Sequence, residues 1–298
     1  MKSTHTRLRI LHSNDIHSHF ERMPRIASLF AGLRAEAGEE HTLTLDIGDH
    51  MDRMRPETEG TQGEANIDVL LATGYDAVTL GNNEGLTFPP QVLQERFGNH
   101  PGFQVVVANL IEPGTGRPPV WASPFHVMNK AGLKIGLIGC TAPFAEFYRL
   151  LGWEVQEPLN LVAKLAEEPR PQVDVLIVMS HLGIRQDERM AAEIPGIDVI
   201  LGGHTHHLLE EPLRIGSALV CAAGKFGQYI GVVDLEVEPG GKGVVHAEGR
   251  VLAVDAAESD PDVGLLIARH TLTARETLGH EVARLGKERP PIGIRSRR

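Results

Sequence analysis

Short apolar runs, each followed by polar residues, are the feature that most constrains the fold of this 298-residue chain. The runs are rich in Val, Ile and Leu and cover residues 8–11, 42–47, 76–80, 103–110, 134–139, 174–179 and 198–203. They lack a regular alternation of apolar and polar residues, as expected of strands buried on both faces. Helix-like stretches lie between several of them, at 24–37, 64–73, 89–97, 158–168 and 186–193. Strands that alternate with helices predict an α/β domain.

The pattern changes from about residue 217. The segments "ALVCAAGKFGQYIGVVDLEVE" and "GKGVVHAEGRVLAV" predict strand pairs, with a hairpin turn at "PGGKG". Residues 258–285 predict one helix, and "RPPIGIRSRR" predicts a mobile basic tail. Because the sequence holds no internal repeat, one α/β sandwich with a trailing helix is the simplest arrangement.

The charge balance of the chain excludes several classes of partner. There are 29 Lys and Arg residues against 39 Asp and Glu residues, a formal net charge of −10. Nucleic acids and anionic membranes require a basic surface, so we expect neither as a partner. No signal-like segment or membrane-length apolar run is present, and the two cysteines lie in apolar sequence. We therefore expect buried, reduced thiols and a cytoplasmic location, and the oligomeric state stays open.

Polar side chains of the kind that bind metals follow the predicted strands repeatedly. They occur in the segments "HSNDIHSH", "DIGDHMD", "LGNNEG", "VMSHLG" and "LGGHTHH". The residues concerned are Asp15, His17, Asp49, Asn82, His181, His204 and His206. In an α/β sheet the carboxyl ends of the strands are where sites are built, so we expect these side chains to meet at one edge.

This set of side chains suits two divalent ions. Carboxylates, an amide oxygen and imidazoles together favour Mn, Zn, Fe, Co or Ni over calcium, which prefers oxygen ligands. Seven residues are too many for one ion, so one aspartate is expected to bridge a pair. Two carboxylates against two divalent ions leave a surplus of about +2, which suits binding of a phosphate and activation of a water.

The motifs D-x-H, G-D, G-N, a lone His after a strand and G-H-x-H, in this order, strongly resemble those of the calcineurin-like metallophosphoesterases. The opening "LHSNDIHSHF" and the sequence that follows resemble the 5′-nucleotidase branch, over roughly residues 8–255. The resemblance implies a four-layer αββα sandwich, a metallophosphoesterase domain over residues 1–257 and a linker-like helix with the basic tail over 258–298.

The resemblance also implies how the ligands divide between two metals. The first metal would be held by Asp15, His17, Asp49 and His206. The second would be held by Asp49, Asn82, His181 and His204. Asp49 is then the bridging carboxylate.

The chain departs from the family pattern in two places. The family's G-N-H-E motif carries a catalytic histidine, whereas this chain has Asn83 at that position, so a neutral amide replaces a group that can donate a proton. We expect Asn83 to orient the phosphate or the leaving oxygen. The family's C-terminal nucleoside-binding domain is also missing from these residues, which places substrate selection in question.

Four further residues are weaker candidates for contacts with the substrate or with the ligands themselves. They are His19, His50, Asn109 and His207. Glu84 is expected to accept hydrogen bonds behind the second metal. Lys225 and Phe226 either line the pocket or belong to a strand edge.

The predicted function is a dinuclear phosphoesterase that hydrolyses small phosphate esters, nucleotides or related metabolites, through attack by a metal-activated hydroxide. A phosphodiesterase with the same metal core is one alternative. A catalytically weak metal-binding module that acts as a sensor or interaction domain is another, favoured by Asn83. The sequence lacks a G-x-S-x-G elbow, a P-loop motif and an H-E-x-x-H motif, which makes a serine hydrolase a poorer account.

Overall fold

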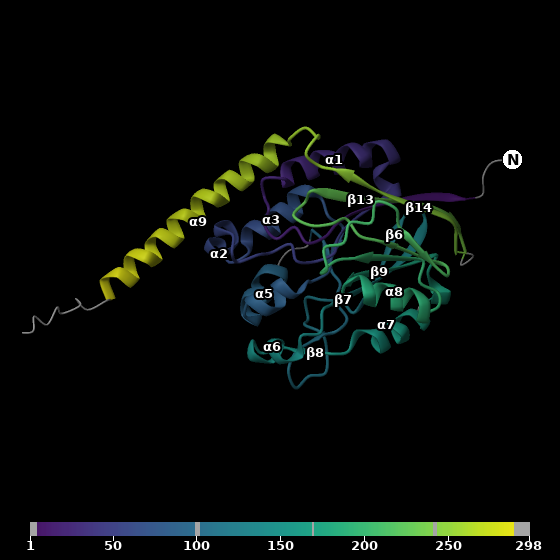
Figure 1. Cartoon of the computed structure of the whole chain (residues 1–298), viewed down its shortest axis with the longest axis horizontal. Coiled ribbons are helices and arrows are strands. Elements are labelled where there is room, and N and C mark those ends of the chain that lie inside the picture. Colours follow the sequence, from purple (N-terminus) through teal and green to yellow (C-terminus); the bar gives the residue numbers. More distant parts are fainter. Residues whose placement is uncertain (1–4, 99–101, 169, 241–242, 289–298) are drawn as a thin grey trace, which may run out of the picture.

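Two six-stranded sheets form the centre of the molecule, seen here in a computed structural model that describes residues 5–98, 102–168, 170–240 and 243–288 (Figure 1). The first sheet has the order β14-β13-β1-β2-β3-β4 and the second β11-β12-β10-β9-β7-β6. In each sheet the central pairs are parallel, and antiparallel strands lie toward one or both edges. The parallel centre follows from the strand–helix alternation of the sequence.

The strands of the first sheet are β1 (Thr6–Ser13), β2 (Thr42–Asp46), β3 (Ala77–Val78), β4 (Gln104–Val105), β13 (Tyr229–Glu238) and β14 (Gly243–Ala253). Those of the second are β6 (Phe125–Lys130), β7 (Leu133–Thr141), β9 (Val175–His181), β10 (Val199–Gly202), β11 (Leu213–Ile215) and β12 (Ala218–Cys221). A separate short pair joins β5 (Leu110–Ile111) and β8 (Glu154–Val155).

The helices are α1 (Met23–Ala37), α2 (Pro56–Thr61), α3 (Glu64–Thr73), α4 (Asn82–Thr87), α5 (Pro90–Phe97), α6 (Ala145–Leu150), α7 (Pro158–Glu167), α8 (Ile184–Glu193) and α9 (Pro261–Glu288). Short 3₁₀ turns lie at η1 (Glu39–His41) and η2 (Arg170–Gln172).

Three layers of buried apolar side chains show the predicted four-layer αββα sandwich. Between the sheets, residues such as Leu43 and Leu45 of β2 pack with Ile135 and Ile177 of the second sheet. On the outer face of the first sheet, α1 and α3 supply side chains such as Phe30. On the outer face of the second sheet, α7 and α8 do the same. Strands covered on both faces explain why their sequences are continuously apolar.

One predicted strand is wrong in extent. We expected a single strand over 103–110, but β4 and β5 are separated and lie in different sheets. The reason is that the segment crosses toward the second sheet: Ala108 N–H donates to the carbonyl of Gly139 in β7, and Val107 N–H to that of Ser123.

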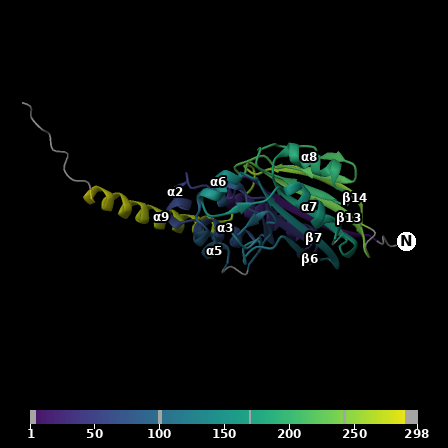
Figure 2. The same ribbon diagram turned by 90° about the horizontal axis from the view of Figure 1, so that it is seen from below.

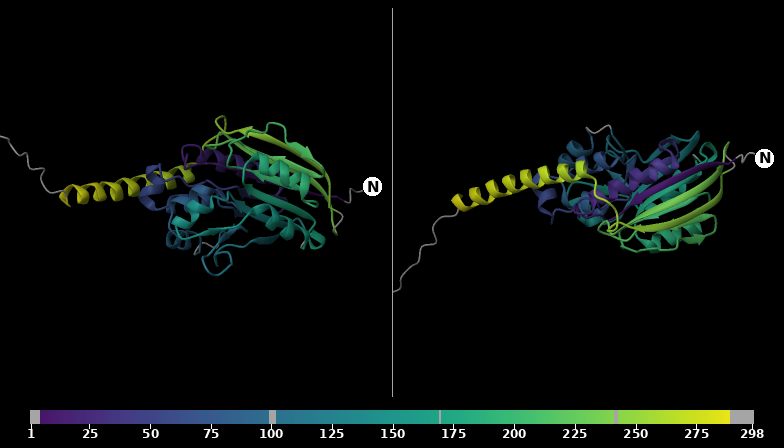
Figure 3. Two further views of the ribbon diagram at one scale, coloured as in Figure 1. Left: turned by 60° about the horizontal axis from the view of Figure 1, so that its bottom comes forward. Right: turned by 90° about the horizontal axis from the view of Figure 1, so that it is seen from above.

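The helix predicted at 258–285 is confirmed as α9. Its first half packs on α1, α2 and α3, and His270 Nε2 lies 2.9 Å from Asp68 Oδ2 of α3. Its far half stands clear of the sandwich in all views (Figures 2 and 3). The predicted basic tail lies outside the described residues, as does part of the predicted β13–β14 turn.

Two further expectations concern cysteines and membrane spans. Cys140 and Cys221 are both buried and form no disulfide, as predicted. Within the described ranges, no helix combines the length and apolar character needed to span a bilayer.

Candidate metal centre

The carboxyl ends of β1, β2, β9 and β10 and the start of α4 carry the predicted ligands to one edge of the two sheets. Their side chains form two clusters, within each of which the possible ligand atoms all lie within 4.8 Å of one another. The first cluster is Asp15, His17 and His206, and the second is Asp49, His181 and His204. The histidines and Asp15 fall into the two groups that the family resemblance implies, whereas Asn82 and the sharing of Asp49 are not part of these clusters.

The Asp49 carboxylate lies between the clusters and approaches His181 more closely than the Asp15 carboxylate does, whose Oδ1 is 3.9 Å from His181 Nε2. Asp49 Oδ2 lies 3.7 Å from His17 Nε2 in the first cluster and 3.3 Å from His181 Nε2 in the second. In the first cluster, His206 Nε2 lies 3.2 Å from His17 Nε2 and 3.3 Å from Asp15 Oδ1. Nitrogen and oxygen atoms converge here at distances that a shared cation would bridge.

Left-handed backbone conformations aim these side chains inward. The φ angles are 52° at Asp15, 48° at His17, 51° at Asp49, 72° at His204 and 57° at His206. Residues other than glycine rarely adopt such angles, which cost of order 1 kcal/mol each. Strain of this kind persists where the surroundings fix it, and it concentrates at functional sites.

Backbone hydrogen bonds join the strained loops after β1 and β2. Asp15 N–H donates to the Gly48 carbonyl at 3.0 Å, and His17 N–H donates to the Asp49 carbonyl at 2.8 Å. The Asp15 carboxylate also accepts the backbone N–H of His204 and the side-chain amide of Asn14. The ligand-bearing loops are therefore linked to one another before any ion is bound.

Close backbone approach explains the glycine before two of the ligands. A Cβ on Gly81 would lie 2.0 Å from Asp49 Oδ1, and one on Gly203 would lie 2.9 Å from His181 Nδ1. Neither position has room for a larger residue unless a ligand moves. The G-N and G-H dipeptides of the sequence thus have a steric origin.

Among the described residues, the buried polar side-chain atoms without a hydrogen-bond partner include two that belong to predicted ligands of the second metal. They are His181 Nε2 and Asn82 Oδ1. His181 Nδ1–H donates to the Ile47 carbonyl at 2.7 Å, which leaves Nε2 as the ring nitrogen that faces the cluster. Buried polar atoms are almost always satisfied, so these two orphans fit a bound cation.

The electrostatics point the same way. Burial lowers the pKa of His181, but the nearby carboxylates of Asp49 and Asp15 raise it more, to about 10. Burial raises the pKa of Asp15, yet the rings of His17 and His206 hold it well below its usual value. The buried carboxylates thus favour positive charge at the ligand positions.

Glu84 supports the centre from behind, as predicted. Its buried carboxylate accepts the backbone N–H groups of Met51 and Gly81 at 2.9 Å each and of Asp49 at 3.2 Å. Burial and the charge of Asp49 raise the pKa of Glu84 to about 7. Glu84 thereby ties the loop after β2 to the start of α4.

The weaker candidates fall into two groups. His19 lies at the rim, its ring centroid 4.2 Å from that of Phe226, and exposed His207 contacts the Thr205 hydroxyl. His50 and Asn109 are buried away from the rim. His50 Nδ1 lies 3.1 Å from the Asn66 amide nitrogen, and Asn109 bridges the backbone N–H and carbonyl of Thr141. These last two are bracing residues, because burial and their partners keep them from a substrate.

Three residues contact ligand histidines in ways that the sequence analysis did not predict. Phe226, for which the sequence left two roles open, packs on the rings of both His17 and His206, with centroids 5.6 Å and 6.1 Å away. Asp52 Oδ2 lies 3.4 Å from His17 Nδ1. Phe144 lies against His204. A hollow of about 730 Å³ opens beside His17 and Asn83.

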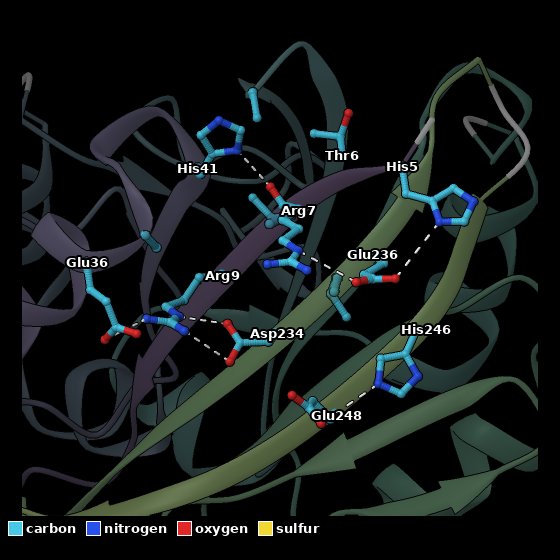
Figure 4. Close-up of a pocket in the computed structure, with 14 residues that line it drawn as sticks. His5, Thr6, Arg7, Arg9, Glu36, His41, Asp234, Glu236, His246 and Glu248 are labelled. Carbon is cyan, nitrogen blue, oxygen red and sulfur yellow. Dashed lines mark hydrogen bonds and ion pairs between the residues drawn. The ribbon is translucent and has the colours of Figure 1, made fainter. Parts of the chain in front are cut away.

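A larger hollow, of about 920 Å³, lies at the opposite, amino end of β1 (Figure 4). Its charges are paired with one another: Arg9 with Asp234 at 2.7 Å and Glu36 at 3.2 Å, and Arg7 with Glu236 at 3.6 Å. The two arginines face four carboxylates, so this surface has no excess of positive charge that would attract a phosphate. Its size alone does not make it the functional site.

Comparisons with known proteins agree with this geometry. The family model "Calcineurin-like phosphoesterase" matches residues 8–208, so the chain belongs to the calcineurin-like phosphoesterase family. It is 41% identical over 235 residues to "Uncharacterized metallophosphoesterase YunD" of Bacillus subtilis (strain 168), covering 78% of this chain and 50% of that one. It is 25% identical over 309 residues to a snake venom 5′-nucleotidase of Gloydius brevicauda, covering 86% and 50%.

The fold has a close structural counterpart. A 5′-nucleotidase precursor from Thermus thermophilus superposes with a TM-score of 0.79 at 24% identity, covering 90% of this chain and 59% of that one. The chain spans about half the length of the two curated relatives named above. The family uses divalent metals, and this chain carries two candidate clusters of metal ligands.

Proposed function

We propose that this protein is a dinuclear metal-dependent phosphoesterase that hydrolyses small phosphate esters, with nucleotides among them. The observation that carries the proposal is the Asp49 carboxylate between the two ligand clusters. One oxygen within reach of both clusters suits a pair of ions about 3.5–4 Å apart, the spacing of two-metal phosphoesterase sites.

The roles of the chain's own residues follow from their contacts. Asp15, His17 and His206, with Asp49, would hold the first ion, and His181, His204 and Asn82, with Asp49, the second. Two divalent ions would bind the phosphate oxygens and lower the pKa of a water for attack on phosphorus. The loops that carry the ligands are already linked by hydrogen bonds, so little rearrangement is needed on metal binding.

In this proposal Asn83 does not orient the phosphate or the leaving oxygen, as expected from the sequence, but has another role. Its side-chain amide contacts His17 Nδ1 at 2.9 Å, and its backbone N–H donates to Asp49 Oδ1 at 2.7 Å. These contacts support a residue that holds two ligands in place. Asn83 then contributes to catalysis through His17 and Asp49 and not through the leaving oxygen.

The proposed substrate class rests on the charge of the metal centre and on the relatives of this chain. A centre with an excess of positive charge in an acidic chain favours small anionic esters over nucleic acid. The named 5′-nucleotidase relative supports nucleotides as substrates.

A panel assay tests the proposal. Manganese-loaded protein is incubated with nucleoside monophosphates, sugar phosphates, nitrophenyl phosphate and phosphodiesters, and phosphate release is measured. We expect hydrolysis of monoesters that is abolished by EDTA and by Asp49→Ala. Hydrolysis of diesters alone would favour the phosphodiesterase alternative. Binding of two ions without turnover of any ester would favour the sensor or interaction module.

A further inference from the structure

Two exposed phenylalanines lie at the edge of the candidate metal centre. The ring centroid of Phe144 lies 5.6 Å from that of His204. Phe147, one turn along α6, has its ring centroid 6.5 Å from that of Phe144, with the ring planes at 81°. Phe144 is 39% exposed and Phe147 62% exposed. Adjoining exposed aromatic rings are a feature of binding surfaces, because their burial by a ligand is favourable.

The helix that carries the pair is fixed relative to the ligands. Tyr148 of α6 is fully buried, and its hydroxyl lies 2.9 Å from that of Thr141 at the end of β7. The Tyr148 ring packs against Gly85 of α4, where a Cβ would lie 2.4 Å from Tyr148 Cε1. Since α4 begins at Asn82, the pair and the second cluster are held on one rigid support.

The charges of α6 balance one another. The two charged side chains of α6, Glu146 and Arg149, pair with each other at 3.1 Å. This surface therefore does not attract a phosphate, and it suits an uncharged group. On the other side of the centre, the Phe226 ring is already covered by His19. The Phe144–Phe147 pair is thus the open aromatic surface beside the ligands.

We propose that the Phe144–Phe147 pair is the subsite for the flat, uncharged heteroaromatic part of the phosphate ester, such as a nucleobase. Two rings at a steep angle offer a planar group one face to stack on and one edge to contact. This inference rests on the proposed function, because the ligand clusters must hold the phosphate for the pair to meet the rest of the ester.

The test compares two esters that share a ribosyl phosphate group and differ in the base. The ratio of kcat/KM for AMP to that for ribose 5-phosphate is measured on the manganese-loaded full chain. In Phe147→Ala we expect this ratio to fall about tenfold, the scale of lost base stacking. Phe147→Trp should preserve the ratio. Phe144→Leu keeps apolar volume but should lower the ratio, because stacking needs a ring.

Leu150→Ala is the matched control, since Leu150 lies on the same helix, is 83% exposed and has no ring. Its ratio should stay within about twofold of the wild-type value. Thermal melts and metal content show whether each variant is folded and loaded. A ratio unchanged in both Phe147→Ala and Phe144→Leu overturns the proposal.

A binding measurement separates this inference from the proposed function. AMP is titrated calorimetrically into manganese-loaded wild type and Phe147→Ala. If no ester is hydrolysed, the proposed function fails. The affinity for AMP then tests the subsite without any measurement of activity. AMP binding about tenfold weaker in Phe147→Ala supports the subsite, and equal affinity in the two proteins overturns it.

Discussion

The side-chain amide nitrogen of Asn83 lies 2.9 Å from Nδ1 of His17, within hydrogen-bond distance of the ring. An amide offers a donor on one side and an acceptor on the other, so a half-turn lets it serve either tautomer of the imidazole. Metal-binding histidines rely on such a partner at the second ring nitrogen for their orientation. Residue 83 therefore stands behind a ligand of the first cluster.

Replacing this amide should weaken metal binding. In Asn83→Ala we expect the affinity of the first cluster for Mn²⁺ to fall about 10- to 100-fold, the usual effect of losing a partner of a ligating histidine. The second cluster should be nearly unaffected. Isothermal titration with Mn²⁺ measures both, and Asn129→Ala, at an exposed position in β6, is the control. Normal binding of both ions with slow ester hydrolysis would instead assign Asn83 to the substrate.

Substitutions of single ligands should affect the two metal sites differently. Asp49→Ala should lose both ions, because Asp49 lies within reach of both clusters. His206→Ala should weaken mainly the first site and His181→Ala mainly the second. Metal content after loading and desalting, measured by plasma mass spectrometry, gives the result. Two tightly held ions in Asp49→Ala would disprove the bridging role.

Gly81→Ala should weaken metal binding, although Gly81 is not itself a ligand. The added Cβ would lie 2.0 Å from Asp49 Oδ1, so the carboxylate must move and metal binding should fall. Gly32→Ala is the control, since Gly32 is exposed in α1 with nothing within 4 Å of the added carbon. We expect it to keep its metals and to gain about 0.5–1 kcal/mol of stability from helix propensity. Equal metal content in both variants would contradict the steric account.

The buried Asp187 should make stability depend on pH. Burial raises its pKa to about 7 from 3.8, and the Ser180 hydroxyl donates a hydrogen bond to it. A carboxyl with a raised folded-state pKa stabilises fully below its unfolded pKa and loses that contribution as pH rises to about 7. The free energy of unfolding of Asp187→Asn relative to wild type should therefore increase from about pH 4 to pH 8.

The size of this increase is about 1.4 kcal/mol for each pH unit of that window at most. Urea unfolding of the metal-free proteins at several pH values checks it, with EDTA present throughout. The variant-minus-wild-type difference isolates Asp187 from the other titrating groups. A difference that is flat with pH would show that Asp187 is ionised at no cost in the folded protein.

The position of the site could be predicted from the sequence because parallel strands end at a common edge. His204 and His206 follow an apolar strand, and Asp15 and His17 follow another, so their meeting requires only the α/β arrangement. The α/β class was predictable for a similar reason, since continuous apolar strands need cover on both faces, whereas the four-layer arrangement was implied by the family resemblance.

Other features depend on tertiary contacts that no local pattern reports. The side chain of Asn83 contacts His17, 66 residues away in the sequence. Phe144, just before α6, contacts His204, which follows β10. The break between β4 and β5 follows from hydrogen bonds to Gly139 and Ser123. The left-handed φ angles of Asp15 and His17 likewise occur in a loop that is hydrogen-bonded to Gly48 and Asp49, more than 30 residues away.

The central claim is that the two clusters hold two divalent ions that share Asp49. Crystals grown with Mn²⁺ and measured near its absorption edge test this directly, through an anomalous difference map. We predict two peaks about 3.5–4 Å apart. One should lie among Asp15, His17 and His206, the other should lie beside His181 and His204, and Asp49 should contact both. A single peak, or peaks away from these side chains, under saturating Mn²⁺ would contradict the account.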